Sequence, residues 1–85
     1  MHELGVATEI CRIVEAHAGD GAPFVTSVAV VVGADAGIEP SSLEFCLEVM
    51  LRQPPFRRAT PLIRTEPGDA LRVDYLEVDD GRSSH

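Results

Sequence analysis

The chain has 85 residues, of which 45% are hydrophobic and 25% are charged. This length supports one small core and excludes a second domain, and the composition is that of a folded protein rather than a disordered one. The formal net charge of -7, reached without a single lysine, argues against a phosphate-binding surface. Nucleic acid is therefore not an expected partner.

The first element that the sequence predicts is an amphipathic helix over residues 4–18. Its apolar positions recur every three or four residues, at Leu4, Ala7, Ile10, Cys11, Val14 and Ala18. Gly19 supplies a left-handed stop. His17 lies near the apolar stripe at the C-terminal end, where a half-buried structural histidine is a better interpretation than a metal ligand.

A strand is predicted over residues 24–32, which are rich in valine. Neither of its faces is strongly polar, so this strand is expected at the centre of a sheet. Residues 33–37 form a loop that begins and ends with glycine. This loop is not a phosphate-binding loop, because the Gly-Lys-Ser/Thr that follows in such loops is missing.

The second predicted helix begins in one of two ways. Pro40 occupies the first helical position, or Ser41 is the N-cap and Glu44 closes a capping box. Both starts bury the same stripe, and Pro54-Pro55 ends the helix. The stripe consists of Leu43, Cys46, Leu47 and Met50, widened by Phe45 and Val49.

Residues 59–66 and 71–78 are predicted strands joined by Glu66-Pro67-Gly68-Asp69. Proline followed by glycine is typical of a type II turn, so the two strands are expected to pair as an antiparallel hairpin. The order of elements is then helix, strand, helix, strand, strand. This order predicts an α+β fold in which two helices pack on one face of a three-stranded mixed sheet. We expect one domain over residues 1–78 and a flexible tail over residues 79–85.

Cys11 and Cys46 lie far apart, each inside an apolar helical pattern, and no Cys-x-x-Cys pair occurs. Buried free thiols are the expected state, which indicates a reducing cytoplasm. No zinc site is expected, and no apolar run is long enough to cross a bilayer, so neither zinc nor a membrane is an expected partner.

The start of the chain carries the pattern with the clearest chemistry. The α-amine, the amide nitrogen of residue 2 and the imidazole of His2 can close adjacent chelate rings around a square-planar ion, Ni(II) or Cu(II). The positive end of the following helix favours the neutral amine and imidazole that metal binding requires. On these residues alone, a solvated terminus without a role is the alternative.

Several segments taken together resemble the HypA/HybF family, nickel metallochaperones of [NiFe] hydrogenase maturation. The resemblance rests on Met1-His2-Glu3-Leu4, Val14-Glu15-Ala16-His17-Ala18, Gly37-Ile38-Glu39-Pro40, Leu43-Glu44-Phe45 and Leu71-Arg72-Val73-Asp74-Tyr75-Leu76-Glu77-Val78. It implies that Met1, His2 and Glu3 hold nickel through the terminal amine, the histidine side chain and backbone nitrogens. It also implies a hydrogenase large subunit and the GTPase HypB as partners.

One departure from the family is large. Members insert a zinc domain with two Cys-x-x-Cys pairs between the last two strands, where this chain has only Glu66-Pro67-Gly68-Asp69. The expected function is nickel delivery to the hydrogenase large subunit. The alternative is a non-enzymatic assembly or adaptor protein that keeps the fold and partner surface without carrying metal. An enzyme is not expected, because no nucleophile-base pair, paired carboxylate motif or nucleotide loop is visible.

Overall fold

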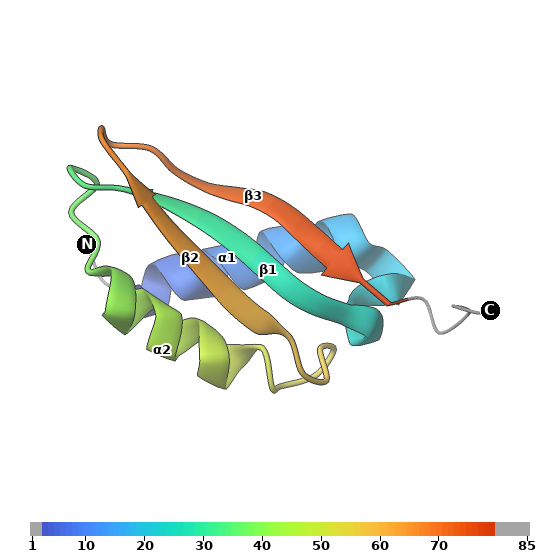
Figure 1. Ribbon diagram of the computed structural model, residues 1–85. Coiled ribbons are helices and arrows are strands. Elements are labelled where there is room, and N and C mark those ends of the chain that lie inside the picture. The colour runs from blue at the N-terminus through green and yellow to red at the C-terminus, as the bar shows by residue number, and fades with distance from the viewer. Residues whose placement is uncertain (1–2, 80–85) are drawn as a thin grey trace.

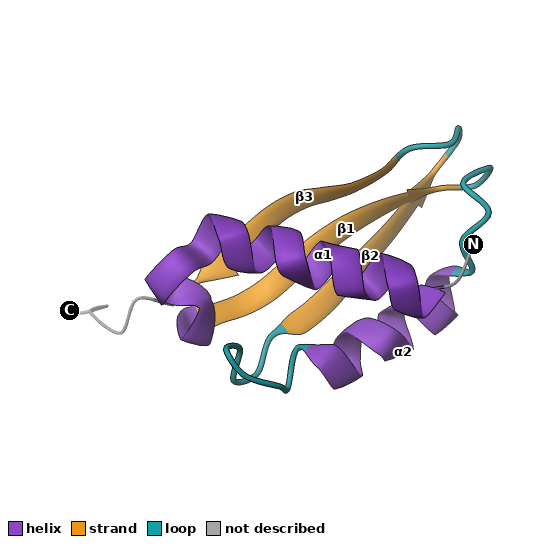
Figure 2. Ribbon diagram, turned by 180° about the vertical axis from the view of Figure 1, so that it is seen from behind, coloured by secondary structure: helices purple, strands orange, loops and turns teal. Residues whose placement is uncertain are grey.

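The computed structural model describes residues 3–79, which form two helices, one 3-10 turn and three strands. In chain order these are α1 (Glu3–Ala18), η1 (Gly19–Phe24), β1 (Val25–Gly33), α2 (Pro40–Met50), β2 (Thr60–Glu66) and β3 (Leu71–Val78). Both helices lie on the same face of the sheet (Figure 2). The predicted α+β fold with a mixed three-stranded sheet is confirmed.

The strand order is β2-β1-β3, with β1 parallel to β2 and antiparallel to β3. The prediction that the valine-rich strand is central is confirmed. The predicted hairpin between the last two strands is wrong, because β2 and β3 flank β1 and do not pair with each other. In this order the apolar strand β1 has a hydrogen-bonded neighbour on both edges. If β2 and β3 paired with each other instead, β1 would lie at the edge of the sheet with one side unpaired.

The connection between β2 and β3 crosses the end of β1 (Figure 1). Adjacent strands are about 4.8 Å apart, so β2 and β3 are separated by about 10 Å, which four residues span without difficulty. The crossing chain bonds to β1 and the residues after it. The N–H of Gly33 donates to the carbonyl of Ala70 at 2.6 Å, and the N–H of Asp35 donates to the carbonyl of Gly68 at 2.7 Å.

Gly33 is required at this crossing by the close approach of the two chain segments. A Cβ at this position would lie 2.3 Å from the carbonyl oxygen of Gly68, well inside van der Waals contact. Gly68 itself has a φ of 100°, a conformation that favours glycine. The Pro67-Gly68 pair therefore lies in a bend of the chain, and this bend carries the chain over β1 instead of back along β2.

The core lies between the sheet and the two helices. Helix α1 contributes the buried residues Val6, Ala7, Ile10, Cys11 and Val14, and α2 contributes Leu43 and Leu47. Three residues expected in the apolar stripes are exposed: Leu4 at 60%, Phe45 at 66% and Val49 at 45%. They are exposed because one sheet covers only one side of each helix. Neither helix within residues 3–79 is long and apolar enough to cross a membrane.

The opposite face of the sheet has no helix over it (Figure 1). Even so, Ala29 and Val31 of the central strand are buried there. The side chains of the flanking strands reach over them, with Tyr75 half-exposed and Arg64 of β2 paired to Asp74 of β3 at 3.5 Å. The two edge strands thus cover the small residues of β1 on this face.

The C-terminal end of the described chain remains bonded just past β3. The N–H of Asp79 donates to the carbonyl of Phe24 at 2.8 Å. The rest of the tail expected at 79–85, residues 80–85, lies outside the described residues.

Candidate metal centre at the start of the first helix

Of the three residues predicted to bind metal, the structure places one. Glu3 is the first residue of α1, whereas Met1 and His2 lie outside the described residues. Of the predicted ligand residues, the structure therefore describes Glu3 alone, and the chelate stays a prediction. Figure 1 shows that this end of α1 lies beside the start of α2.

The Glu3 carboxylate reaches across to the second helix. Its Oε2 accepts a hydrogen bond of 2.9 Å from the backbone N–H of Glu39. This bond lowers the pKa of Glu3 below its ordinary value, and the backbone N–H of Glu3 itself lowers it further. The side chain is thus a charged acceptor near neutral pH, and it is occupied by a donor from residue 39.

Glu39 in turn caps α2. Its carboxylate accepts hydrogen bonds from the backbone N–H of Ser42 at 2.8 Å and from the Ser41 hydroxyl at 2.6 Å. The Ser41 hydroxyl first, and then the Ser42 N–H, lower the pKa of Glu39 to about 2. Helix α2 therefore begins at Pro40, as one of the two predicted starts has it. The alternative, Ser41 as N-cap with Glu44, is wrong, because the Ser41 hydroxyl is itself a donor to Glu39.

The location of Glu3 suits metal binding through the backbone. The first four N–H groups of an α-helix have no acceptor within the helix, and the N–H of Glu3 is directed to its own carboxylate instead of a helical carbonyl. The positive end of the helix dipole also favours a deprotonated nitrogen there.

No second set of metal ligands competes within the described part of the chain. Residues 3–79 hold no group of three or more His, Cys, Asp or Glu side chains arranged to bind an ion. His17 is exposed and lies 14 residues from Glu3 along α1, about 21 Å at 1.5 Å per residue. The half-buried position expected for His17 is wrong, because the helix turns it away from the core. His85 lies outside the described residues.

The two cysteines are free thiols, as expected. Cys11 is buried, and Cys46 is half-buried. Burial, and then the charge of Glu15, raise the pKa of Cys11 to about 11. A thiolate is the form that binds metal, so Cys11 is a poor ligand near neutral pH.

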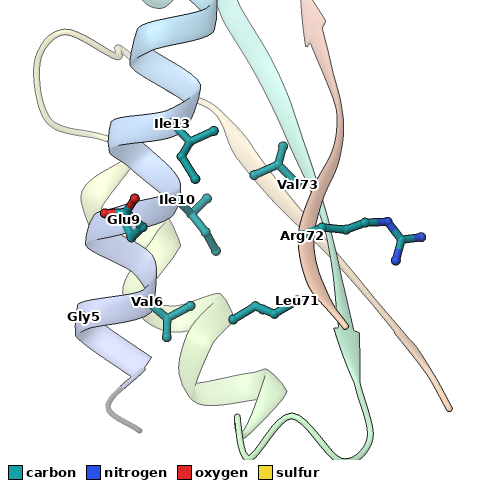
Figure 3. Close-up of a pocket in the computed structure, with 8 residues that line it drawn as sticks. All are labelled: Gly5, Val6, Glu9, Ile10, Ile13, Leu71, Arg72 and Val73. Atoms are coloured by element: carbon teal, nitrogen blue, oxygen red, sulfur yellow. The ribbon is translucent and has the colours of Figure 1, made fainter. Parts of the chain in front are cut away.

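A groove of about 440 Å³ lies between α1 and the edge strand β3. Figure 3 shows Val6 and Ile10 of α1 pointing toward Leu71 and Val73 of β3, whereas Arg72 points away from the groove. The apolar lining of the groove offers contact surface rather than an arrangement of acid and base groups.

Glu39 is the residue at this end of the molecule that the sequence analysis did not single out for the site. A usable signal was present, since Glu39 directly precedes a proline in the first helical position. A carboxylate at that position can accept from an N–H of the first helical turn, as a shorter capping side chain does. The contact of its N–H with Glu3, 36 positions earlier, depends on how the two helices pack and leaves no trace in local sequence.

Comparisons with known proteins agree on one family. The family model described as "Hydrogenase/urease nickel incorporation, metallochaperone, hypA" matches residues 1–74. The hydrogenase maturation factor HypA of Chlorobium limicola is 47% identical over 47 residues, which cover 54% of this chain and 40% of the relative. The same factor from Pelodictyon phaeoclathratiforme is 37% identical over 54 residues, covering 62% and 46%. The chain thus matches less than half the length of these curated relatives.

The fold has a solved counterpart in the solution structure of the Ni metallochaperone HypA from Helicobacter pylori. The TM-score is 0.67, with 16% identity, and the match covers 95% of this chain and 89% of that one. At this identity the likeness establishes the fold alone. Together with the family match over residues 1–74, it leads to one conclusion: the chain belongs to the HypA family of nickel-incorporation metallochaperones.

Proposed function

We propose that this protein binds Ni(II) at its N-terminus and delivers the ion to the large subunit of a [NiFe] hydrogenase. The observation that carries the proposal is the family match that begins at residue 1, on a chain whose second residue is histidine. The terminal amine, the His2 imidazole and the backbone nitrogen of Glu3 form the donor set. The position of Glu3 at the first turn of α1 supports it.

The partners follow from the same family. We propose that the GTPase HypB assists the transfer and that it takes place in the cytoplasm, where the free thiols of Cys11 and Cys46 stay reduced. The curated relatives are named hydrogenase maturation factors, which supports a hydrogenase client. In this role the protein is a carrier and not an enzyme.

A second candidate function is an adaptor that assists hydrogenase assembly without carrying metal. The four residues that join β2 to β3, residues 67–70, favour it. They occupy the place where the family resemblance puts a zinc domain.

Under either function we expect the purified protein to contain no stoichiometric zinc and to stay folded in EDTA. One zinc ion per chain in elemental analysis would contradict that expectation.

Transfer of radioactive nickel tests the carrier function. The protein is loaded with ⁶³Ni, separated from free metal and mixed with a nickel-free hydrogenase large subunit, in the presence of a chelator that removes any released ion. We expect label to pass to the large subunit from the native protein and not from a mock-loaded His2→Ala variant. Nickel that is bound but never transferred would contradict a carrier. A native protein that binds no nickel would leave the adaptor function in its place.

A further inference from the structure

Strand β3 lies at one edge of the sheet and pairs with β1 alone among the elements of residues 3–79. Its outer edge therefore presents backbone N–H and C=O groups to which another strand can bond. The other edge strand, β2, has Pro61 near its start, and a proline cannot donate to a neighbouring strand. Strand β3 contains no proline. Of the two outer edges, that of β3 is thus the more open to a further strand.

The side chains of β3 differ in character between the two faces of the sheet. Those on the helix side are apolar: Leu71, Val73, Leu76 and Val78. Those on the face without helices carry charges or a hydroxyl: Arg72, Asp74, Tyr75 and Glu77. A bulge separates the two halves of the strand, because the register with β1 passes from Val73 to Tyr75 and skips Asp74.

An antiparallel pairing of β3 with the β3 of a second copy has one register in which both faces agree. Its two-fold axis lies between Asp74 and Tyr75, so the bulges of the two copies lie opposite each other and the register is kept on both sides. Arg72 then lies opposite Glu77 of the second copy, and the symmetry forms this pair twice. Opposite charges directly across two strands attract. A shift by one residue would put Arg72 opposite an apolar residue and exchange the two faces.

The helix side of the same pairing closes an apolar groove. Val73 lies opposite Leu76 of the second copy, and Leu71 lies opposite Val78. Leu71 and Val73 line the groove of about 440 Å³ between α1 and β3 (Figure 3). A hollow of about 450 Å³ continues this groove along β3 to Leu76, and the half-buried Ile13 of α1 lines both. A second β3 strand would place its apolar side chains along the open side of this groove.

We propose that the outer edge of β3 is a homodimer interface, in which two copies pair antiparallel and form one sheet of six strands, three from each copy. The occupant is a second copy because the strand matches itself in charge on one face and in apolar character on the other. The net charge of -7 on each chain opposes association, so we expect a dimer that dissociates on dilution. The proposal does not rest on nickel binding.

Two charge variants test the register. Arg72→Glu places two carboxylates opposite each other on both sides of the axis, and Glu77→Arg places two guanidinium groups there. Mixed in equal amounts, the two variants can form a heterodimer in which every such pair again has opposite charges. The double variant Arg72→Glu/Glu77→Arg restores opposite charges between identical chains. Arg58→Glu is the matched control, because it makes the same change in charge at an exposed residue that does not line the groove beside β3.

A control for folding is needed because Arg72 also pairs with Glu66 of its own chain at 3.2 Å. Thermal unfolding of each variant at low protein concentration verifies that the monomer is intact. Glu77→Arg leaves the pair between Arg72 and Glu66 in place, so the test does not depend on Arg72→Glu alone.

Sedimentation equilibrium measures the association from about 10 µM to 1 mM protein, since dimer formation follows mass action. EDTA and a thiol reductant are present, so that neither a metal ion nor a disulfide through the half-buried Cys46 joins two copies. We expect the native protein and Arg58→Glu to shift from monomer toward dimer over this range. Each β3 charge variant alone should have a dimer dissociation constant raised about tenfold or more, because two attractive pairs become repulsive. The mixture and the double variant should dimerise as the native protein does.

Three results would overturn the proposal. A native protein that stays monomeric at the highest concentration would leave the edge of β3 to a segment of another protein. A dimer that both charge variants retain would place the interface elsewhere. Loss of the dimer in both variants without recovery in the mixture would contradict this register. Isotope-filtered NMR of the native dimer gives the direct observation, for which we expect contacts between Val73 of one copy and Leu76 of the other.

Discussion

The two helices begin side by side at one end of the sheet, but their first turns are built differently. Helix α2 is completed from its own sequence, since Pro40 has no N–H to satisfy and the Glu39 carboxylate caps Ser42. The first turn of α1 instead sends the Glu3 carboxylate across to Glu39. The start of α2 serves stability, and under the proposed function the start of α1 supplies a backbone nitrogen to an ion. Variants at each helix start, and in the core and the crossing, should therefore affect stability and nickel binding independently.

The largest expected effect is at the α1 start. His2→Ala should lower nickel affinity by more than about 100-fold, because removing a direct donor should exceed the 10- to 100-fold typical of an outer-shell partner. Thermal unfolding of the metal-free protein should not change, since the residue precedes α1. Calorimetry and a melting curve on the same preparation measure both quantities. A lowered melting temperature would show that the start of α1 also serves stability.

Leu47→Ala in α2 should lower stability and leave nickel affinity unchanged, which is the opposite of the result expected for His2→Ala. Leu47 is fully buried in the core, and truncating such a leucine lowers the free energy of unfolding by about 2–5 kcal/mol. Nickel affinity of the folded protein at 10 °C should match that of the native protein. Urea unfolding gives the first quantity and calorimetry the second. The exposed Val49→Ala in the same helix is the matched control, for which little change is expected.

A smaller loss is expected for Gly33→Ala at the crossing. The new methyl group would meet the carbonyl of Gly68, and such overpacking costs about 1–3 kcal/mol. Gly5→Ala is the control, because a Cβ at Gly5 meets nothing within 4 Å, and in a helix this change should leave stability equal or raise it by up to about 1 kcal/mol. Urea unfolding of both variants measures the difference. Equal stability of Gly33→Ala and the native protein would contradict the close crossing of β1.

The smallest expected effect is a difference in pH dependence between the cap of α2 and nickel binding at the start of α1. The pKa of Glu39 is about 2, below that of an unfolded glutamate, so its stabilising effect is complete above about pH 4.3 and is lost as pH falls toward 2. Free amines titrate near 7.7–8.0 and imidazoles near 6.5, so nickel binding should already weaken between about pH 8 and 6. Circular dichroism across pH 2–8 follows the loss of the Glu39 cap, and nickel titration over the same range follows the loss of metal binding. Glu39→Ala should remove only the acid transition that belongs to the cap.

The sequence was sufficient for elements whose signals are local. The periodicity of α1, the valine run of β1 and the Pro40 start of α2 each depend on neighbours within a few residues. Strand pairing was not predictable in this way. The Pro67-Gly68 turn indicates a reversal of direction, and β3 does run opposite to β2, but nothing in those residues says that β1 lies between them.

The candidate site shows the same limit. Met1, His2 and Glu3 were predicted as nickel ligands from their chemistry and their family resemblance; the family match covers their positions, and their role stays a prediction. The role of Glu39 could not be derived, since it depends on the packing of two helices that the loop at residues 34–39 and strand β1 separate. Contacts between distant segments require the fold itself.

The central claim is that nickel binds through the free amine of the chain, and one measurement tests it most directly. Calorimetric nickel titration compares the protein that begins at Met1 with a form that carries one extra residue before it. The extension converts the amine into an amide without touching the core. We predict one Ni(II) per chain for the first form and no binding for the second, with identical circular dichroism. Equal nickel binding by the extended form would contradict the claim and place the site elsewhere.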